Sequence, residues 1–141
     1  MADCVFCSIA ADSAPAHRVY EDERTVAFLD ANPAARGHTL VVPRAHAESI
    51  TDMRGPLVED VFRTVRRVAV ALGSTLGAGG TNVVQSNGRA AGQDVFHAHV
   101  HVIPRYEDDA VDLGWAAGDA DEAVLTDTAA ALREESDALS R

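Results

Sequence analysis

The 141-residue chain carries 12 Lys and Arg residues against 22 Asp and Glu, a formal net charge of −10, and 47% of its residues are hydrophobic. This length supports one hydrophobic core, so we expect a single domain over residues 1–141, and the charge favours a small-molecule ligand over a nucleic-acid polymer, whose phosphates it would repel. The sequence contains no lysine, which excludes Schiff-base chemistry and a P-loop lysine, and it has neither an N-terminal signal pattern nor an apolar run of about 20 residues, so we expect a cytoplasmic protein without a membrane partner.

The first part of the chain predicts a short helix followed by three strands. Asp3 stands where an N-cap would begin a helix over residues 4–11. Residues 18–21 and 25–30 are rich in β-branched and aromatic residues on either side of an acidic turn, and they predict a β-hairpin. Residues 38–44 predict a third strand, which its proline ends.

The second part predicts one long helix and two more strands. Between Gly55 and Gly73, apolar residues recur at steps of three and four, the spacing of a buried helix face. Residues 81–85 predict a strand, residues 86–92 a flexible loop, and residues 95–103 a last strand. The apolar positions of the helix are Leu57, Val61, Val65, Val68 and Leu72.

The tail from about residue 107 is acidic and is expected to be the variable part of the domain. It predicts a loop and then an amphipathic helix from about Asp121 to Leu139. The elements together predict an α+β fold: an antiparallel sheet with one long helix packed on a face, a short N-terminal helix and a C-terminal helical tail.

Three histidines alternate along the last predicted strand, at His97, His99 and His101. Alternation puts all three on one face, about 6.6 Å from one to the next, with Phe96, Ala98, Val100 and Val102 on the other. Such a row can supply a nucleophile, an orienting donor and a proton carrier, because imidazole is largely neutral near pH 7. Alternating histidines also suit a metal ion.

The loop before this strand favours phosphoryl chemistry over a metal. Asn87, Gly88, Gly92 and Gln93 make it small and rich in hydrogen-bond donors, so that it can approach an anion.

Two cysteines, Cys4 and Cys7, have the spacing at which both thiolates reach one Zn²⁺, but they fill only half of a tetrahedral shell. A disulfide across two intervening residues would brace little of a cytoplasmic fold. The pair alone is consistent with free buried thiols, a redox pair or half of a metal site.

Residues 4–106 resemble the histidine triad (HIT) family of nucleotide-binding hydrolases and transferases. The histidine motif carries the resemblance together with a Gly-His-Thr-Leu strand upstream of it. The matching stretches are Tyr20-Glu21-Asp22, Ala27-Phe28-Leu29-Asp30, Pro33, Gly37-His38-Thr39-Leu40-Val41-Val42-Pro43-Arg44-Ala45-His46 and Gly92-Gln93-Asp94-Val95-Phe96-His97-Ala98-His99-Val100-His101-Val102-Ile103-Pro104-Arg105.

The resemblance implies a role for each matching polar residue. His99 would attack phosphorus and form a nucleotidyl-histidine that water resolves, His101 would bind phosphate oxygens, and His38 would join their hydrogen-bonded cluster. Gln93 would lie beside the bridging atom and leaving group. The phosphate loop would hold Ser86, Asn87 and Gly92.

Asp30 matches the carboxylate that accepts the ribose hydroxyls in the family, although the residues alone favour a turn-capping aspartate before Asn32-Pro33. Two positions depart from the family pattern. Asp94 stands where many relatives have Ser or Thr, and a carboxylate there would repel phosphate unless it points away. Ser86 replaces a common Asn or Gln.

The resemblance also implies a structural zinc, with His46 and His97 completing the shell begun by Cys4 and Cys7. A filled shell leaves no open position for water, so attack would remain with His99.

The function implied is hydrolysis or transfer at the α-phosphate of a purine nucleotide derivative, in first place an adenosine 5′-phosphoramidate. The alternatives are a dinucleoside polyphosphate hydrolase, a nucleotide-binding regulatory module without turnover, and a zinc-dependent hydrolase. Family members usually pair through the long helix, so a homodimer is expected.

Overall fold

A computed structural model describes residues 3–139, and the chain divides into two units at the boundary between Val111 and Asp112. The first unit contains a five-stranded antiparallel sheet, the helices α1 (Val5–Ala10) and α2 (Gly55–Leu76), and two short 3-10 helices, η1 (Ile50–Asp52) and η2 (Arg89–Ala91). The second contains α3 (Glu122–Leu139). This confirms the predicted α+β class. Within residues 3–139, no helix is long and apolar enough to cross a membrane.

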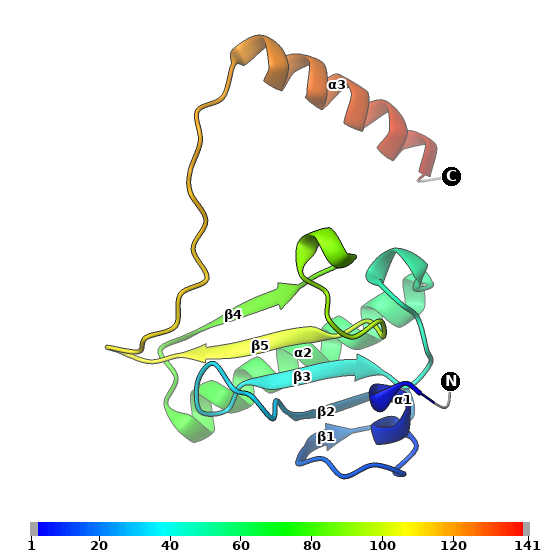
Figure 1. The fold of residues 1–141 in the computed structure, drawn as a ribbon, viewed down its shortest axis with the longest axis vertical. Coiled ribbons are helices and arrows are strands. Elements are labelled where there is room, and N and C mark those ends of the chain that lie inside the picture. The colour runs from blue at the N-terminus through cyan, green and yellow to red at the C-terminus, as the bar shows by residue number, and fades with distance from the viewer. Residues whose placement is uncertain (1–2, 140–141) are drawn as a thin grey trace. The chain divides into compact units, whose positions relative to one another are not determined.

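The sheet has the order β1-β2-β3-β5-β4, and Figure 1 shows it with α2 behind it. Each neighbouring pair is antiparallel. The bounds of the strands are β1 Arg18–Glu21, β2 Thr25–Leu29, β3 Thr39–Pro43, β4 Gly80–Gln85 and β5 Val100–Arg105. The first four agree with the predicted strands to within one residue at each end.

The predicted bounds of the last strand were wrong, because β5 begins at Val100 and not at residue 95. The segment before it leaves the sheet, and the backbone N–H of Ala98 donates to the carbonyl of Ala47 instead of to a ladder partner. His97 and His99 therefore lie in the segment that leads into β5, and only His101 is on the strand. Phe96 is 39% exposed and does not join the core face to which alternation assigned it.

The long helix α2 packs on one face of the sheet through four of the five residues that its sequence pattern predicts, and the fifth, Leu57, is half-buried. Val61, Val65, Val68 and Leu72 cluster with strand residues that are almost fully buried, namely Ala27, Val41, Val100 and Val102. Each valine or leucine side chain of this cluster contributes roughly 1.5–3 kcal/mol by leaving water. The helix continues past Gly73 and ends where Gly77 adopts the left-handed conformation, with φ of 69°.

The opposite face of the sheet is covered by α1. Its Phe6 and Ile9 pack with Val26, Phe28, Leu40 and Val42 of β2 and β3. The predicted cap was wrong: Cys4, not Asp3, is the N-cap, and its Sγ accepts a hydrogen bond from the Cys7 backbone N–H at 3.4 Å.

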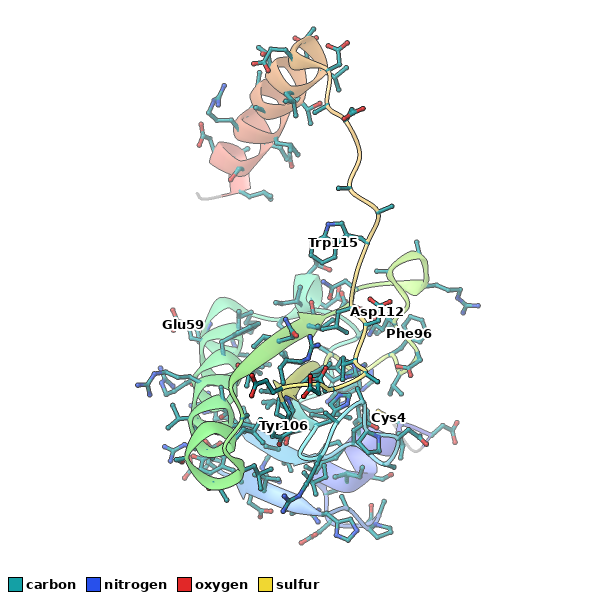
Figure 2. The ribbon with its side chains drawn as sticks, turned by 90° about the vertical axis from the view of Figure 1, so that its left-hand side faces the viewer. Cys4, Glu59, Phe96, Tyr106, Asp112 and Trp115 are labelled. Atoms are coloured by element: carbon teal, nitrogen blue, oxygen red, sulfur yellow. The ribbon has the colours of Figure 1, made fainter. Side chains whose placement is uncertain are left out.

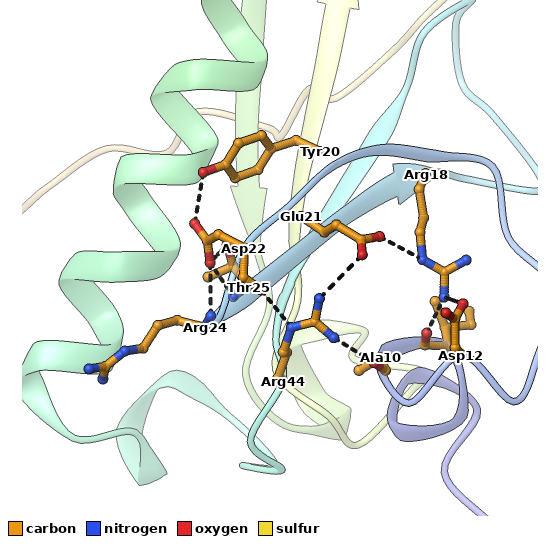
Figure 3. Close-up of polar contacts among 10 residues, drawn as sticks. Ala10, Asp12, Arg18, Tyr20, Glu21, Asp22, Arg24, Thr25 and Arg44 are labelled. Carbon is orange, nitrogen blue, oxygen red and sulfur yellow. Dashed lines mark hydrogen bonds and ion pairs between the residues drawn. The ribbon is translucent and has the colours of Figure 1, made fainter.

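Two arginines attach the end of α1 to the sheet (Figure 3). Arg18 donates to the carbonyl of Ile9, and Arg44 donates to that of Ala10 at 2.6 Å. Glu21 pairs with both guanidiniums, at 3.0 and 3.7 Å. The last carbonyls of a helix lack intrahelical partners, so these bonds hold a helix of only six residues in a fixed place.

The second unit contains α3 at the predicted position. Asp121 caps it, since its Oδ1 accepts a 2.8 Å hydrogen bond from the backbone N–H of Ala123. None of the residues of α3 that the structure describes is buried, and Leu132 is 65% exposed.

Candidate active site and metal cluster

A cavity of about 830 Å³, here called the main cavity, opens on the sheet face that carries α1. His99, His101 and Asp30 line it, as does Asp94. Most of the remaining wall is apolar, and none of these wall residues was assigned to the site from the sequence: Val5, Phe6, Ile9, Phe28, Leu29, Leu40 and Val95. Their one available signal was the three-residue spacing of Phe6 and Ile9, which indicates a buried helix face but not a ligand.

His99 is held by one hydrogen bond and one ring contact. Its Nδ1–H donates to the backbone carbonyl of His97 at 2.8 Å, and its ring meets that of Phe6 edge-on at 5.1 Å between centroids. The residue is only 5% exposed. Because Nδ1 carries the proton, neutral His99 keeps a free lone pair on Nε2, the atom a nucleophile needs.

His38 and His101 form a directional chain of hydrogen bonds. The backbone N–H of Ala34 donates to His38 Nδ1 at 2.9 Å, so the proton of neutral His38 sits on Nε2. That Nε2–H donates to His101 Nδ1 at 2.9 Å, which in turn places the proton of neutral His101 on its own Nε2. His101 therefore offers a donor to the cavity, where His99 offers a lone pair.

Burial keeps these two imidazoles neutral. It lowers the pKa of His38 below the usual 6.5, with Asp30 acting in the opposite direction. Burial also lowers the pKa of His101, reinforced by His99 and His38. The donor chain is therefore maintained at neutral pH.

Asp30 caps a turn, as the residues alone predict, and its role toward ribose hydroxyls stays a prediction. Its Oδ1 accepts from the backbone N–H of Asn32 at 2.8 Å, as a turn-capping aspartate does. Its Oδ2 lies 3.5 Å from His38 Nε2 and 3.9 Å from His101 Nδ1. The carboxylate thus caps the turn and faces the histidines from the wall of the main cavity.

The loop over residues 86–95 is fixed by two amides. Gln93 is 5% exposed; its Oε1 accepts from the Gly88 N–H at 2.7 Å, and its Nε2 donates to the carbonyls of Glu48 and Val95. Asn87 exchanges two hydrogen bonds with Gln85 and accepts from the N–H of Ile50 at 2.8 Å.

These amides are therefore engaged by protein groups, and Ser86, Asn87, Gly92 and Gln93 do not line the main cavity within the described residues. Gly92 has a φ of 87°, which suits glycine. The contacts predicted for these four residues with phosphate and leaving group stay predictions.

Asp94 does not point away from His99. Its Oδ1 lies 3.7 Å from His99 Nε2, and its side chain is 82% exposed.

Four residues predicted as zinc ligands, Cys4, Cys7, His46 and His97, come together as a metal cluster. Their ligand atoms all lie within 4.8 Å of one another. His97 Nδ1 is 3.4 Å from both sulfurs, and His46 Nδ1 is 3.3 Å from Cys7 Sγ. His97 is fully buried, and its Nε2–H donates to the carbonyl of Pro43 at 2.8 Å, which leaves Nδ1 free to ligate.

This arrangement fits Zn²⁺. With Zn–S near 2.3 Å and Zn–N near 2.0–2.1 Å, the edges of a tetrahedron of ligands are about 3.3–3.8 Å, close to the nitrogen–sulfur distances found. Two thiolates and two imidazoles fill the shell, so a zinc ion here would fasten α1 to the segment before β5.

A protein-family model described as the HIT domain matches residues 11–108. The chain belongs to the HIT family. SMU.412c from Streptococcus mutans UA159 is similar to this HIT protein, with a TM-score of 0.91 and 38% identity over 96% of this chain and 86% of that one. A Zn-bound histidine triad family protein from Mycobacterium smegmatis has a TM-score of 0.76 and 40% identity, over 83% of this chain and 85% of that one. Adenylylsulfatase HINT3 of Arabidopsis thaliana is 36% identical over 82% of this chain and 57% of its own.

Proposed function

We propose that this HIT protein is a nucleotidyl hydrolase or transferase that acts on the α-phosphate of purine nucleotide derivatives, in first place adenosine 5′-phosphoramidates. The observation that carries the proposal is the hydrogen bond from His99 Nδ1–H to the His97 carbonyl, which puts the lone pair of the neutral ring on Nε2, beside the main cavity. The 36% identity with a plant protein named as an adenylylsulfatase supports chemistry at an adenylyl phosphorus.

The main cavity suits a nucleoside. The apolar wall formed by Phe6, Ile9, Phe28 and Leu40 can pack against a flat purine, and Asp30 can accept hydrogen bonds from ribose hydroxyls. In this arrangement the α-phosphorus would lie near His99 Nε2, and His101 Nε2–H would donate to a phosphate oxygen.

The reaction then proceeds in two displacements. His99 Nε2 forms a bond to phosphorus while the bond to the leaving group breaks, and the leaving atom keeps the electron pair and takes a proton from water. Water next attacks phosphorus, the pair returns to Nε2, and a nucleoside monophosphate is released. His101 stabilises the charge that develops on the phosphate oxygens in both steps.

We also propose a structural metal ion and a quaternary structure for this protein. Zinc held by Cys4, Cys7, His46 and His97 would be structural, as its full shell leaves no position for water. The similar Zn-bound protein from Mycobacterium smegmatis supports this assignment. We further propose that residues 1–141 form a single functional domain with a variable tail from about residue 107. We also propose that the protein forms a homodimer through α2 and is cytoplasmic.

His99→Ala is the deciding variant. We expect turnover of an adenosine phosphoramidate to fall by at least about 10³-fold, since the nucleophile is gone, while AMP binding measured by calorimetry survives. Mass spectrometry of quenched wild-type reactions should find a nucleotidyl adduct on the peptide that contains His99. Near-wild-type turnover by the variant would refute the mechanism.

Two alternatives have their own signatures. A dinucleoside polyphosphate hydrolase would turn over diadenosine tetraphosphate faster than the phosphoramidate in the same preparation. A binding module without catalysis would bind AMP and form no adduct.

A further inference from the structure

Asp94 brings a negative charge to the attacking atom. Its Oδ1 is 3.7 Å from His99 Nε2, yet 82% of its side chain is exposed, so the carboxylate is both close to the reaction and hydrated. Asp94 has no role in the two displacements proposed for His99.

A second hollow of about 380 Å³ continues from the main cavity at this point. It shares Val5, Asp94 and Val95 with the main cavity and adds Asp3, Cys4 and Phe96. Figure 2 shows Cys4 and Phe96 on the same side of the first unit. If the apolar wall and Asp30 hold the nucleoside, the substituent on the far side of phosphorus extends past Asp94 into this second hollow.

The charges around the second hollow are unequal. Among residues 3–139, Asp3 and Asp94 line it, and Arg89 is a cation near it, with its guanidinium carbon 5.9 Å from the centre of the Phe96 ring. Cys4 adds no net charge when the metal cluster holds zinc, because two thiolates balance the ion. The described side chains that line the second hollow therefore carry negative and no positive charge when the thiolates are balanced by zinc.

We propose that Asp94 determines which leaving groups this enzyme accepts. It favours phosphoramidates whose amine carries a further positive charge, and it disfavours leaving groups that carry carboxylate or phosphate. This inference rests on the proposed function of His99.

The step concerned is the first displacement. As His99 Nε2 bonds to phosphorus, the P–N bond breaks, and the nitrogen keeps the electron pair and takes a proton from the water that reaches the exposed Asp94. A cation on the departing amine is attracted to the carboxylate, and an anion is repelled. For unit charges several ångströms apart near a protein surface, the effect is about tenfold in rate.

The test uses three adenosine phosphoramidates that share the P–N bond and differ in leaving-group charge: those of ethylenediamine, ethanolamine and glycine. We expect the wild-type kcat/KM to fall in that order. Asp94→Asn removes both the attraction and the repulsion, so it should reduce the ratio between the ethylenediamine and glycine compounds by about 100-fold and should raise the relative rate on diadenosine tetraphosphate.

Glu59→Gln is the matched control. It also removes one exposed carboxylate, but from α2, which covers the opposite face of the sheet (Figure 2). It should leave the ratio unchanged. Because the side chain of Asp94 is 82% exposed and asparagine has the same size, the variant is expected to fold normally.

Each other outcome has a distinct meaning. If all three compounds are turned over and Asp94→Asn leaves their ratio as in the wild type, this inference is wrong and the proposed function stands. If the wild type prefers the glycine compound and Arg89→Gln removes that preference, Arg89 governs selection, and the inference is again wrong. If the wild type turns over none of the compounds and forms no adduct on His99, the proposed function fails, and this inference fails with it.

Discussion

The carbonyl oxygen of His97 accepts the Nδ1–H of His99 at 2.8 Å, while the imidazole of His97 faces Cys4 and Cys7. One residue thus orients His99, the proposed nucleophile, with its backbone and joins the metal cluster with its side chain. A change at the metal cluster is therefore expected to reach His99 through a single peptide unit.

Zinc should be present and structural. Protein purified without added zinc is expected to contain about one equivalent per chain, measured by plasma emission spectrometry, and Cys7→Ser should lower both the zinc content and the melting temperature. Loss of turnover on chelation should follow the loss of folded protein. Less than half an equivalent in the wild type would refute the zinc assignment, and immediate inhibition of fully folded protein would indicate catalytic zinc.

The hydrogen bonds predict a tautomer for each imidazole at neutral pH. His99 should carry its proton on Nδ1, and His38 and His101 should carry theirs on Nε2. Nitrogen-15 NMR of the ring nitrogens separates these forms, and His38→Gln should alter the signals of His101 more than those of His99. A proton on Nε2 of His99 would contradict its assignment as nucleophile.

Stability should fall as the pH drops below about 6.5. The folded pKa values of His38 and His101 are below that unfolded value, so between the folded and unfolded pKa values the unfolded chain binds more protons and the free energy of unfolding rises with pH. Each histidine contributes a slope of up to about 1.4 kcal/mol per pH unit.

Urea titrations from pH 7.5 to 5.0 measure this dependence. The residues of the metal cluster also bind protons, but they are the same in the wild type and in His101→Gln. The difference between the two slopes of unfolding free energy against pH therefore gives the contribution of His101. Equal slopes in the two proteins would show that His101 does not contribute.

Gly37→Ala should destabilise the protein by about 2–4 kcal/mol. Gly37 has a φ of 98°, and a Cβ there would lie 2.7 Å from Leu76 Cδ1 and 2.9 Å from Leu72 Cδ2. The next residue is His38, so turnover should fall as well.

Gly73→Ala is the control for that experiment. It lies within α2 with nothing within 4 Å of an added Cβ, and it should stabilise the protein by up to about 1 kcal/mol. Urea denaturation compares the two. If the two variants change the free energy of unfolding equally, the backbone at Gly37 adjusts to the added methyl group without a cost in stability, and this prediction is wrong.

Much of the fold could be predicted because its signals are local. The spacing of Val61, Val65 and Val68 depends only on helical periodicity, and the pattern predicts the face that α2 buries. The start of β5 depends on distant groups instead: His97 turns out of the sheet to reach the Pro43 carbonyl and the cysteines. No local pattern before Val100 encodes that exit.

The same contrast applies to the site. The type and spacing of His97, His99 and His101 indicate chemistry, and the structure brings His38 and Asp30 to them. Amide side chains are less informative, because Gln93 satisfies its hydrogen bonds with backbone groups as distant as Glu48. The sequence cannot tell whether an amide faces a ligand or the protein's own backbone.

Cys4 and His97 are 93 positions apart in the chain, yet their Sγ and Nδ1 atoms are separated by 3.4 Å. A metal ion held there closes nearly the whole first unit into a ring, and ring closure of this length restricts the unfolded chain far more than a local clip does. During synthesis, Cys4 and Cys7 cannot meet the last of the four residues until His97 has been made. Capture of a metal ion by all four would therefore come only after most of the first unit has been synthesised.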